Sequence, residues 1–171
     1  GLPLGPGQEG EVRLRGPNIF AGYHKLPEET DSAFDELGWF RTGDIGIIDD
    51  DGFLAITGRH KEMIIVGGEN VFPREIEEVL NSHPSVRASG VIGTVCPMRG
   101  EVPVAFVELE DDESFDEAAI RALCREKLAG YKVPKEIRLL DELPRNPTGK
   151  ITRRALRPML EAKDRGTQDV A

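Results

Sequence analysis

Four short segments of the chain hold side chains that could act on a charged ligand. Near the carboxyl end, residues 144–150 (PRNPTGK) present Lys150 on a loop that prolines stiffen and Gly149 frees. A lysine ammonium is a compact point charge, suited to neutralising anionic reactants. Residues 38–44 (GWFRTGD) end in Asp44, whose acceptor-only carboxylate suits the cis-diol of a ribose. Taken singly, Lys150 is also compatible with an inert surface lysine, and Asp44 with the cap of a turn.

The other two segments lie between these. Residues 58–62 (GRHKE) fall where the pattern of the chain changes, so Arg59 could anchor a ligand between two parts of the protein. A basic surface cluster is the alternative interpretation. Residues 67–70 (GGEN) follow an apolar run and precede a predicted helix, a place where backbone without side chains can approach a ligand closely. The alternative there is a simple turn between a strand and a helix.

Two differently patterned parts of the chain must position these segments. Up to residue 58, short alternating runs and turn residues predict hairpins, one of them with its tip at Asp51-Gly52. After residue 58, we expect strands over residues 63–66, 86–95, 102–109 and 137–140, and helices beginning at Pro73, at a Ser114/Glu117 capping box and at Thr152. The predicted fold class is therefore α+β: a domain of about 100 residues, with helices packed on one face of a small sheet, preceded by a β-rich fragment.

Composition excludes several classes of protein. The 171 residues include 22 Lys plus Arg against 31 Asp plus Glu, and the formal net charge of −9 argues against a nucleic-acid partner. No run reaches the about 18 apolar residues of a membrane span, so no transmembrane segment is expected. Cys96 and Cys124 lack disulfide or zinc-site spacing, which predicts reduced thiols, no metal site and a cytoplasmic location. The acidic run 108–117 is interpreted as a solvated turn.

Together and in this order, the four segments resemble the AMP-forming acyl-CoA synthetases of the adenylate-forming ligase superfamily. The similarity runs from about Gly10 to Leu160. It also includes Gly22-Tyr23, Asp51-Gly52, and Pro73 with Glu75. The family's phosphate loop and its Tyr-Gly-x-Thr-Glu segment, which lie upstream of this region, do not occur in these 171 residues.

The resemblance implies a division of the chain. Residues 1–58 are expected to be the β-rich end of a large N-terminal adenylating domain, whose remainder is missing here. Residues 59–61 are expected to be a hinge, 62–160 the small C-terminal domain, and 161–171 a polar tail.

The resemblance also implies a reaction and its residues. A carboxylic acid attacks the α-phosphorus of ATP to give an acyl adenylate and pyrophosphate, and the CoA thiol then displaces AMP. By position in the motifs, Lys150 is the catalytic lysine of the first step, Asp44 and Arg59 bind the nucleotide, and Lys61 is the hinge residue. Mg²⁺ is expected with ATP, with ligands outside this chain, and no metal ligand is expected within it.

Two further segments are implied to contact CoA. They are Gly67, Gly68 and Glu69, expected along the pantetheine passage, and Tyr131 and Lys132, expected on the CoA nucleotide. The chain departs from the family pattern at Val133, where a related ligase carries a second basic residue.

Several alternatives stay open at this level. The chain could belong to an adenylation module that loads a carrier protein, or it could be a non-catalytic interaction module in which Lys150 is a modification target. The isolated 171 residues are expected to be inactive, because the purine and acyl pockets of the family lie upstream. Fatty, aromatic and short dicarboxylic acids are all compatible with the sequence, with fatty acid metabolism as the assumed setting.

Overall fold

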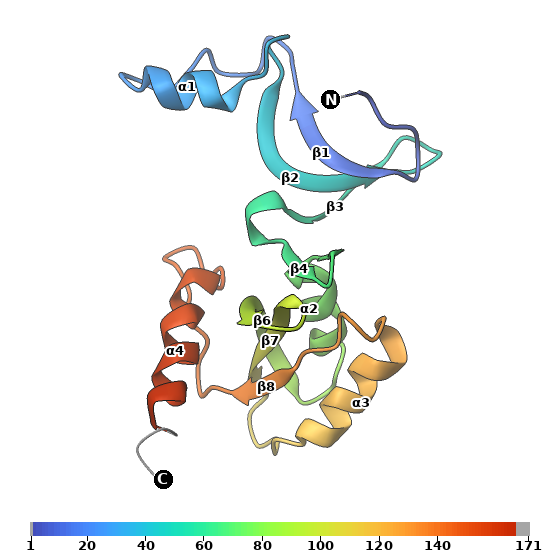
Figure 1. Cartoon of the computed structure of the whole chain (residues 1–171), viewed down its shortest axis with the longest axis vertical. Coiled ribbons are helices and arrows are strands. Elements are labelled where there is room, and N and C mark those ends of the chain that lie inside the picture. The colour runs from blue at the N-terminus through green and yellow to red at the C-terminus, as the bar shows by residue number, and fades with distance from the viewer. Residues whose placement is uncertain (1, 167–171) are drawn as a thin grey trace. The chain divides into compact units, whose positions relative to one another are not determined.

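The chain divides into two compact units, Gly1–Lys61 and Glu62–Ala171. The structure is a computed structural model that describes residues 2–166, with the side chains of residues 2–160 (Figure 1). Each unit has a sheet of its own. The α+β class predicted from the sequence is confirmed.

The first unit is a three-stranded antiparallel sheet in the order β1-β2-β3, formed by β1 (Glu9–Leu14), β2 (Phe40–Ile48) and β3 (Leu54–Arg59). The predicted hairpin tip at Asp51-Gly52 is confirmed, because Gly52 has a φ of 85° and its N–H donates to the carbonyl of Asp49 at 3.1 Å. Between β1 and β2 lies a short helix that the sequence pattern did not predict, α1 (Pro27–Ala33). Its proline at the first turn favours helix initiation.

The second unit has a five-stranded sheet in the order β5-β4-β7-β6, with β8 also pairing β7. Its strands are β4 (Ile64–Val66), β5 (Glu69–Val71), β6 (Val86–Cys96), β7 (Gly100–Leu109) and β8 (Glu136–Leu139). Only β8 runs parallel to its neighbour, and the other pairs are antiparallel. The predicted strands 86–95, 102–109 and 137–140 are thus confirmed, whereas β5 was not predicted.

Three helices accompany this sheet: α2 (Pro73–Asn81), α3 (Glu117–Lys127) and α4 (Arg153–Gly166). Pro73 stands in the first turn of α2, as predicted. The predicted Ser114/Glu117 capping box is wrong, because Asp116 caps α3 by accepting the N–H of Ala119 at 3.0 Å. Pro158 lies inside α4 without ending it.

The polar tail expected from residue 161 begins within a helix, because α4 continues past residue 160 to Gly166. Residues 167–171 of the expected tail lie outside the described residues.

The helices cover both faces of the second sheet, which corrects the prediction of one covered face. Along β6 and β7, successive side chains alternate between two cores. Val91 packs into the core that contains Ile76 of α2 and Ile120 of α3, whereas Ile92 packs into the core that contains Leu156 of α4. In Figure 1, α4 accordingly lies on one side of the β6–β7 ribbon and α2 and α3 on the other.

Candidate functional site

The nucleotide-binding pair predicted from the sequence is brought together in the first unit. Asp44 of β2 and Arg59 of β3 stand opposite each other in the antiparallel register. The Arg59 Nε donates to Asp44 Oδ1 at 2.7 Å. The Arg59 side chain is 63% exposed and that of Asp44 29%, so both remain accessible from solvent.

Asp44 lies within β2 and does not cap a turn, which was the alternative interpretation of this residue. The strand has a bulge at this point, because the register between β1 and β2 shifts between Glu11 and Arg13, opposite residues 42–44. Gly43 has a φ of 71°, which only glycine adopts without strain. Thr42 fixes the bulge: its Oγ1 accepts the Asp44 N–H at 3.0 Å and donates to the Val12 carbonyl at 2.7 Å. The bulge therefore changes the direction of the β2 backbone next to Asp44, so that this carboxylate is presented from within a strand.

The loop that carries Lys150 is held by one asparagine side chain. Asn146 Oδ1 accepts the N–H groups of Thr148 (3.0 Å) and Lys150 (2.9 Å) and the hydroxyl of Thr148 (2.8 Å). Gly149, with a φ of 81°, allows the chain to turn back, so that the Asn146 N–H donates to the Lys150 carbonyl at 2.8 Å. The backbone of the loop is therefore fixed by the Asn146 side chain and by its own hydrogen bonds.

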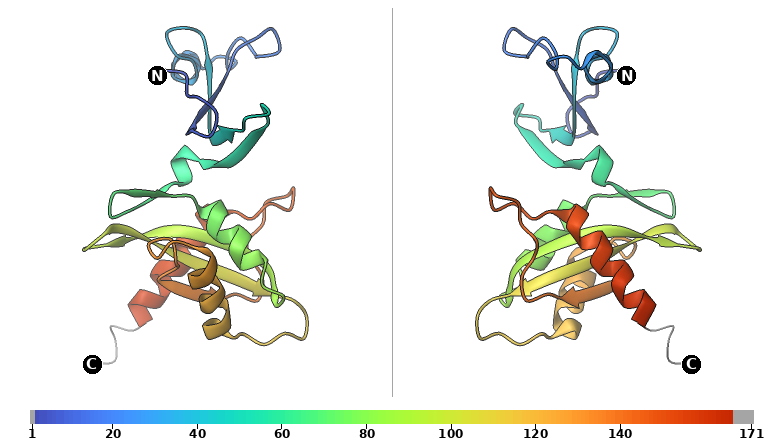
Figure 2. Two further views of the ribbon diagram at one scale, coloured as in Figure 1. Left: turned by 90° about the vertical axis from the view of Figure 1, so that its right-hand side faces the viewer. Right: turned by 90° about the vertical axis from the view of Figure 1, so that its left-hand side faces the viewer.

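The Lys150 side chain itself is exposed. Within the described part of the chain, its ammonium forms no hydrogen bond and no ion pair. The loop precedes α4 and projects from its unit (Figure 2). An exposed cation on a fixed backbone can meet an anionic ligand without first leaving a partner.

The base of this loop rests on a buried carboxylate that sequence reasoning missed. Glu108 of β7 is 5% exposed, although the sequence suggested that it opens a solvated acidic turn. It accepts the Leu143 N–H at 2.9 Å and a guanidinium N–H of Arg145 at 3.2 Å. Arg145 in turn pairs as an isolated bridge with Ile151. Both arms of the Lys150 loop are thus joined at their base.

Gly67 and Gly68 form the tip of a β-hairpin between β4 and β5, which corrects the predicted strand-to-helix turn. Their φ values of 62° and 93° are typical of a two-residue hairpin turn. The Gly67 N–H donates to the Arg99 carbonyl at 2.8 Å, so the tip lies beside the β6–β7 turn (Figure 2). A Cβ added at either glycine would meet nothing within 4 Å. Glu69, the first residue of β5, is exposed next to this bare backbone.

Lys132 is already engaged by a partner. Its Nζ lies 2.7 Å from both carboxylate oxygens of Glu75, on α2, and 5.7 Å from the ring centroid of Tyr131. The Lys132 side chain is only 19% exposed. In residues 2–160, no hydrogen bond or ion pair joins Tyr131 or Lys132 to the Gly67-Gly68 hairpin. The two segments predicted to contact CoA are therefore not brought together by direct polar contacts.

Lys61 is the last residue of the first unit and lies in η1 (His60–Glu62), a single turn of 3₁₀ helix. Its side chain is exposed.

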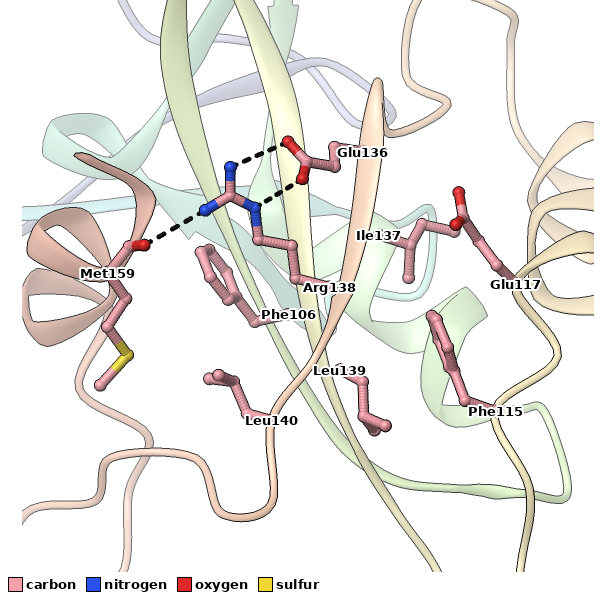
Figure 3. Close-up of a pocket in the computed structure, with 9 residues that line it drawn as sticks. All are labelled: Phe106, Phe115, Glu117, Glu136, Ile137, Arg138, Leu139, Leu140 and Met159. Atoms are coloured by element: carbon pink, nitrogen blue, oxygen red, sulfur yellow. Dashed lines mark hydrogen bonds and ion pairs between the residues drawn. The ribbon is translucent and has the colours of Figure 1, made fainter. Parts of the chain in front are cut away.

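A hollow of about 460 Å³ lies elsewhere in the second unit (Figure 3). It is lined by Phe106, Phe115, Glu117, Glu136, Ile137, Arg138, Leu139, Leu140 and Met159. Figure 3 shows Arg138 turned toward Glu136, with Nε 2.7 Å from Glu136 Oε1, and toward the Met159 carbonyl at 3.2 Å. The hollow contains none of the residues predicted from the sequence to bind a ligand.

The remaining titratable groups of the described residues form no metal-binding site. In the described part of the chain, no group of three or more His, Cys, Asp or Glu side chains could hold a metal ion. No described helix is long and apolar enough to cross a membrane. Cys124 is buried, and burial raises the pKa of its thiol.

The fold and these sites define a class of protein. The family model of the AMP-binding enzyme C-terminal domain matches residues 75–150, so its last matched residue is Lys150. Residues 75–150 thus carry the AMP-binding enzyme C-terminal domain, and the chain as a whole is similar to the C-terminal part of adenylate-forming acyl-CoA synthetases.

Two curated relatives with high identity to this chain are named as CoA ligases. The chain is 51% identical over 160 residues to the 2-succinylbenzoate–CoA ligase of Geobacillus kaustophilus, which covers 94% of this chain and 32% of that protein. It is 48% identical over 153 residues to the sulfoacetate–CoA ligase of Cupriavidus necator, covering 90% of this chain and 30% of that one. The chain thus spans about a third of the length of the curated relatives that it matches.

Solved structures agree with this assignment. The o-succinylbenzoate CoA synthetase of Bacillus subtilis, in complex with its acyl-adenylate intermediate, aligns with a TM-score of 0.83 and 38% identity, over 90% of this chain and 31% of that one. ATP-bound MatB of Rhodopseudomonas palustris aligns with a TM-score of 0.85 and 40% identity, over 91% of this chain and 31% of that one. Apo MatB aligns over the same shares with a TM-score of 0.68.

Proposed function

We propose that this chain is the C-terminal portion of an acyl-CoA synthetase, which converts a carboxylic acid and ATP to an acyl adenylate and then to an acyl-CoA thioester. One observation carries the proposal: Lys150 ends the matched domain on a fixed loop, with its ammonium exposed and unpaired in the described part of the chain. Such a group suits a reaction in which two anions must approach each other.

Lys150 acts in the first half-reaction. The acid carboxylate and the α-phosphate of ATP repel each other, and negative charge accumulates in the transition state. At about 4 Å and an effective dielectric constant near 20, one unit charge contributes about 4 kcal/mol, which corresponds to roughly a thousandfold in rate. Because no described residue neutralises the Lys150 ammonium, its full charge is available to the reacting groups.

Asp44 and Arg59 bind the nucleotide in this proposal. Arg59 engages Oδ1 of Asp44, which orients the carboxylate and leaves its second oxygen to accept from the ribose hydroxyls. The exposed guanidinium of Arg59 has further N–H groups for the ribose or a phosphate. Mg²⁺ accompanies ATP, but the described residues contain no cluster of ligands for it, and no step here depends on their supplying one.

A rotation between the half-reactions is proposed at Lys61. The division between the two units falls directly after this residue, whose side chain is exposed. The different TM-scores of ATP-bound and apo MatB, 0.85 and 0.68 over the same share of this chain, indicate that the matched part of that ligase differs between its own two structures. In the proposal, rotation withdraws the Lys150 loop and brings the Gly67-Gly68 hairpin toward the acyl group.

The CoA contacts are proposed chiefly at the hairpin. The bare backbone of Gly67 and Gly68 leaves room for a pantetheine chain, with Glu69 at its border. Lys132 can reach a CoA phosphate only by sharing or leaving Glu75, and Tyr131 would accompany it by stacking.

The acid is best sought among those that the relatives' names contain. The expected setting of fatty acid metabolism finds no support there, because the curated relatives are named for 2-succinylbenzoate and sulfoacetate. Both acids carry a second anionic group besides the carboxylate that is activated. We propose an acid of that kind.

Product analysis of the complete ligase tests the function. The enzyme is incubated with ATP, Mg²⁺, CoA and, in turn, 2-succinylbenzoate, sulfoacetate and a fatty acid. We expect one acid to give pyrophosphate, AMP and a CoA thioester in equal amounts, and omission of CoA to leave an enzyme-bound acyl adenylate. Release of ADP and phosphate, or transfer of the acyl group to a carrier protein in place of CoA, would contradict the proposal.

A further inference from the structure

One arginine in the second unit joins three parts of the chain that are far apart in sequence. Arg153, at the start of α4, places one terminal guanidinium nitrogen 2.6 Å from Glu62 Oε2 and the other 2.5 Å from Glu77 Oε2. Its Nε also donates to Glu77 Oε1 at 2.9 Å. Arg153 therefore bridges two carboxylates through three nitrogens.

The Glu77 end of this bridge is anchored in the interior. The residue, on α2, is 9% exposed, and its Oε1 also accepts the N–H of Val91 on β6 at 2.8 Å. Its carboxylate is thus held by a sheet strand as well as by Arg153. Arginine suits this position because its planar fork can serve two acceptors at once, which a single lysine ammonium does with less geometric definition.

The Glu62 end lies beside the proposed hinge. Glu62 is the first residue of the second unit, directly after Lys61. At the other end, Arg153 follows the Lys150 loop by three residues. The N–H of Thr152 between them donates to the Pro144 carbonyl at 2.7 Å, which closes that loop at its base. A short series of contacts therefore leads from the start of the unit to the loop of the reactive lysine.

We propose that Glu62 and Arg153 are positioning residues that fix the Lys150 loop relative to the hinge, so that a rotation at Lys61 places the ammonium reproducibly. This inference rests on the proposed function. The partly exposed Arg153–Glu62 pair contributes little to stability, but a displacement of about 1 Å at a reacting group can cost about a hundredfold in rate. The bridge therefore affects the rate of the first half-reaction more than it affects folding.

The substitution Glu62→Gln tests this in the complete ligase. It keeps the size of the side chain, removes the charge next to the hinge and leaves the Arg153–Glu77 pair in place. We expect kcat for acid-dependent pyrophosphate release to fall roughly tenfold, while KM for ATP changes less than about twofold. Thioester formation from preformed acyl adenylate and CoA should also change less than about twofold, because that step does not use Lys150 in the proposed mechanism.

Two further variants separate positioning from folding. Arg153→Lys retains the charge but not the fork, and should show the same selective loss with a thermal midpoint close to that of the unmodified enzyme. Arg74→Gln is the matched control, since it removes an exposed pair on α2, 2.9 Å from Glu78, that leads to no reactive loop. It should leave both half-reactions unchanged.

The outcomes distinguish this inference from the function on which it rests. If Glu62→Gln lowers the rates of both half-reactions equally, the positioning role is wrong and the proposed function stands. The same conclusion follows if Glu62→Gln lowers neither rate while Lys150→Ala suppresses the first half-reaction. If Lys150→Ala itself leaves adenylate formation intact, the proposed function fails.

Discussion

The two units differ in where they keep their apolar side chains. Among residues 2–160, the buried apolar side chains lie in the second unit, with Ile45 of β2 as the single exception. Most large apolar side chains of the first unit are at least partly exposed, with Leu37 at 74% and Phe53 at 73%. Its aromatic cluster of Phe20, Tyr23, Phe34 and Phe40 is held by ring contacts at its surface, with Phe20 itself 40% exposed.

The second unit therefore has a hydrophobic core of its own, whereas the first unit lacks one. Folding depends on apolar burial, so the second unit contains what it needs to fold, and the first does not. In the proposed mechanism the functional side chains are divided in the same way. Asp44 and Arg59 hold the nucleotide on the first unit, and Lys150 belongs to the second unit. A body with its own core can rotate as a unit, as a hinge mechanism requires.

The largest expected effect comes from separating the units. Residues 62–166 produced alone should unfold cooperatively on heating and give well-dispersed amide signals in NMR spectra. Residues 1–61 produced alone should show neither, because they bury too little apolar surface. A cooperative transition for residues 1–61 alone would contradict the comparison.

A core substitution in the second unit should have the next largest effect. Phe106 of β7 is fully buried and packs in the core with Leu156 of α4. Phe106→Ala should lower the free energy of unfolding by about 3–5 kcal/mol, measured by urea titration with far-ultraviolet circular dichroism. The matched control is Ile45→Ala in the first unit, which should leave the transition of the second unit at its original midpoint. A shift of that transition by Ile45→Ala would show that the two units share stability.

The smallest expected effect is a pH dependence confined to the first unit. Asp35 accepts the N–H groups of Trp39 at 2.9 Å and Leu37 at 3.0 Å and pairs with Arg13 at 2.7 Å. The Trp39 N–H, the Leu37 N–H and the Arg13 guanidinium hold the pKa of Asp35 below its ordinary value. Since the folded pKa is depressed, the stabilisation is present above the unfolded value of 3.8 and is lost as the pH falls through the folded value.

Trp39 is the only tryptophan of the chain, so its fluorescence reports on this contact. On acidification of the complete ligase from about pH 6 to about pH 2, with any tryptophan outside these 171 residues replaced by phenylalanine, the emission of Trp39 should change as Asp35 takes up a proton. Asp35→Asn should abolish that step, whereas Asp50→Asn, in the exposed β2–β3 turn, should retain it. An unchanged acid limb in Asp35→Asn would exclude Asp35 as its origin.

Local patterns in the sequence predict much of this molecule. The Asp51-Gly52 hairpin, the start of α2 at Pro73 and the exposed Lys150 loop each depend on residues within a few positions of one another. Their conformations follow from glycine and proline geometry and from hydrogen bonds along a short stretch of chain. The meeting of Asp44 with Arg59 is likewise a consequence of one hairpin register.

Contacts across long separations could not be predicted in this way. Glu108 meets Arg145 across 37 positions, and Glu77 meets Arg153 across 76, so no local pattern distinguishes these carboxylates from solvated ones. The covering of both sheet faces was missed for a related reason. The strands β6 and β7 are apolar on both faces, and a continuous apolar run does not reveal which helix covers which side.

The most direct test of the account is Lys150→Ala in the complete ligase, with the two half-reactions measured separately. Acid-dependent pyrophosphate release should fall about a thousandfold, the loss expected for one unit charge removed from beside the reacting phosphate. Conversion of preformed acyl adenylate and CoA to thioester should stay within a few-fold of the unmodified enzyme. Equal losses in the two half-reactions, or undiminished pyrophosphate release, would contradict the role assigned to this lysine.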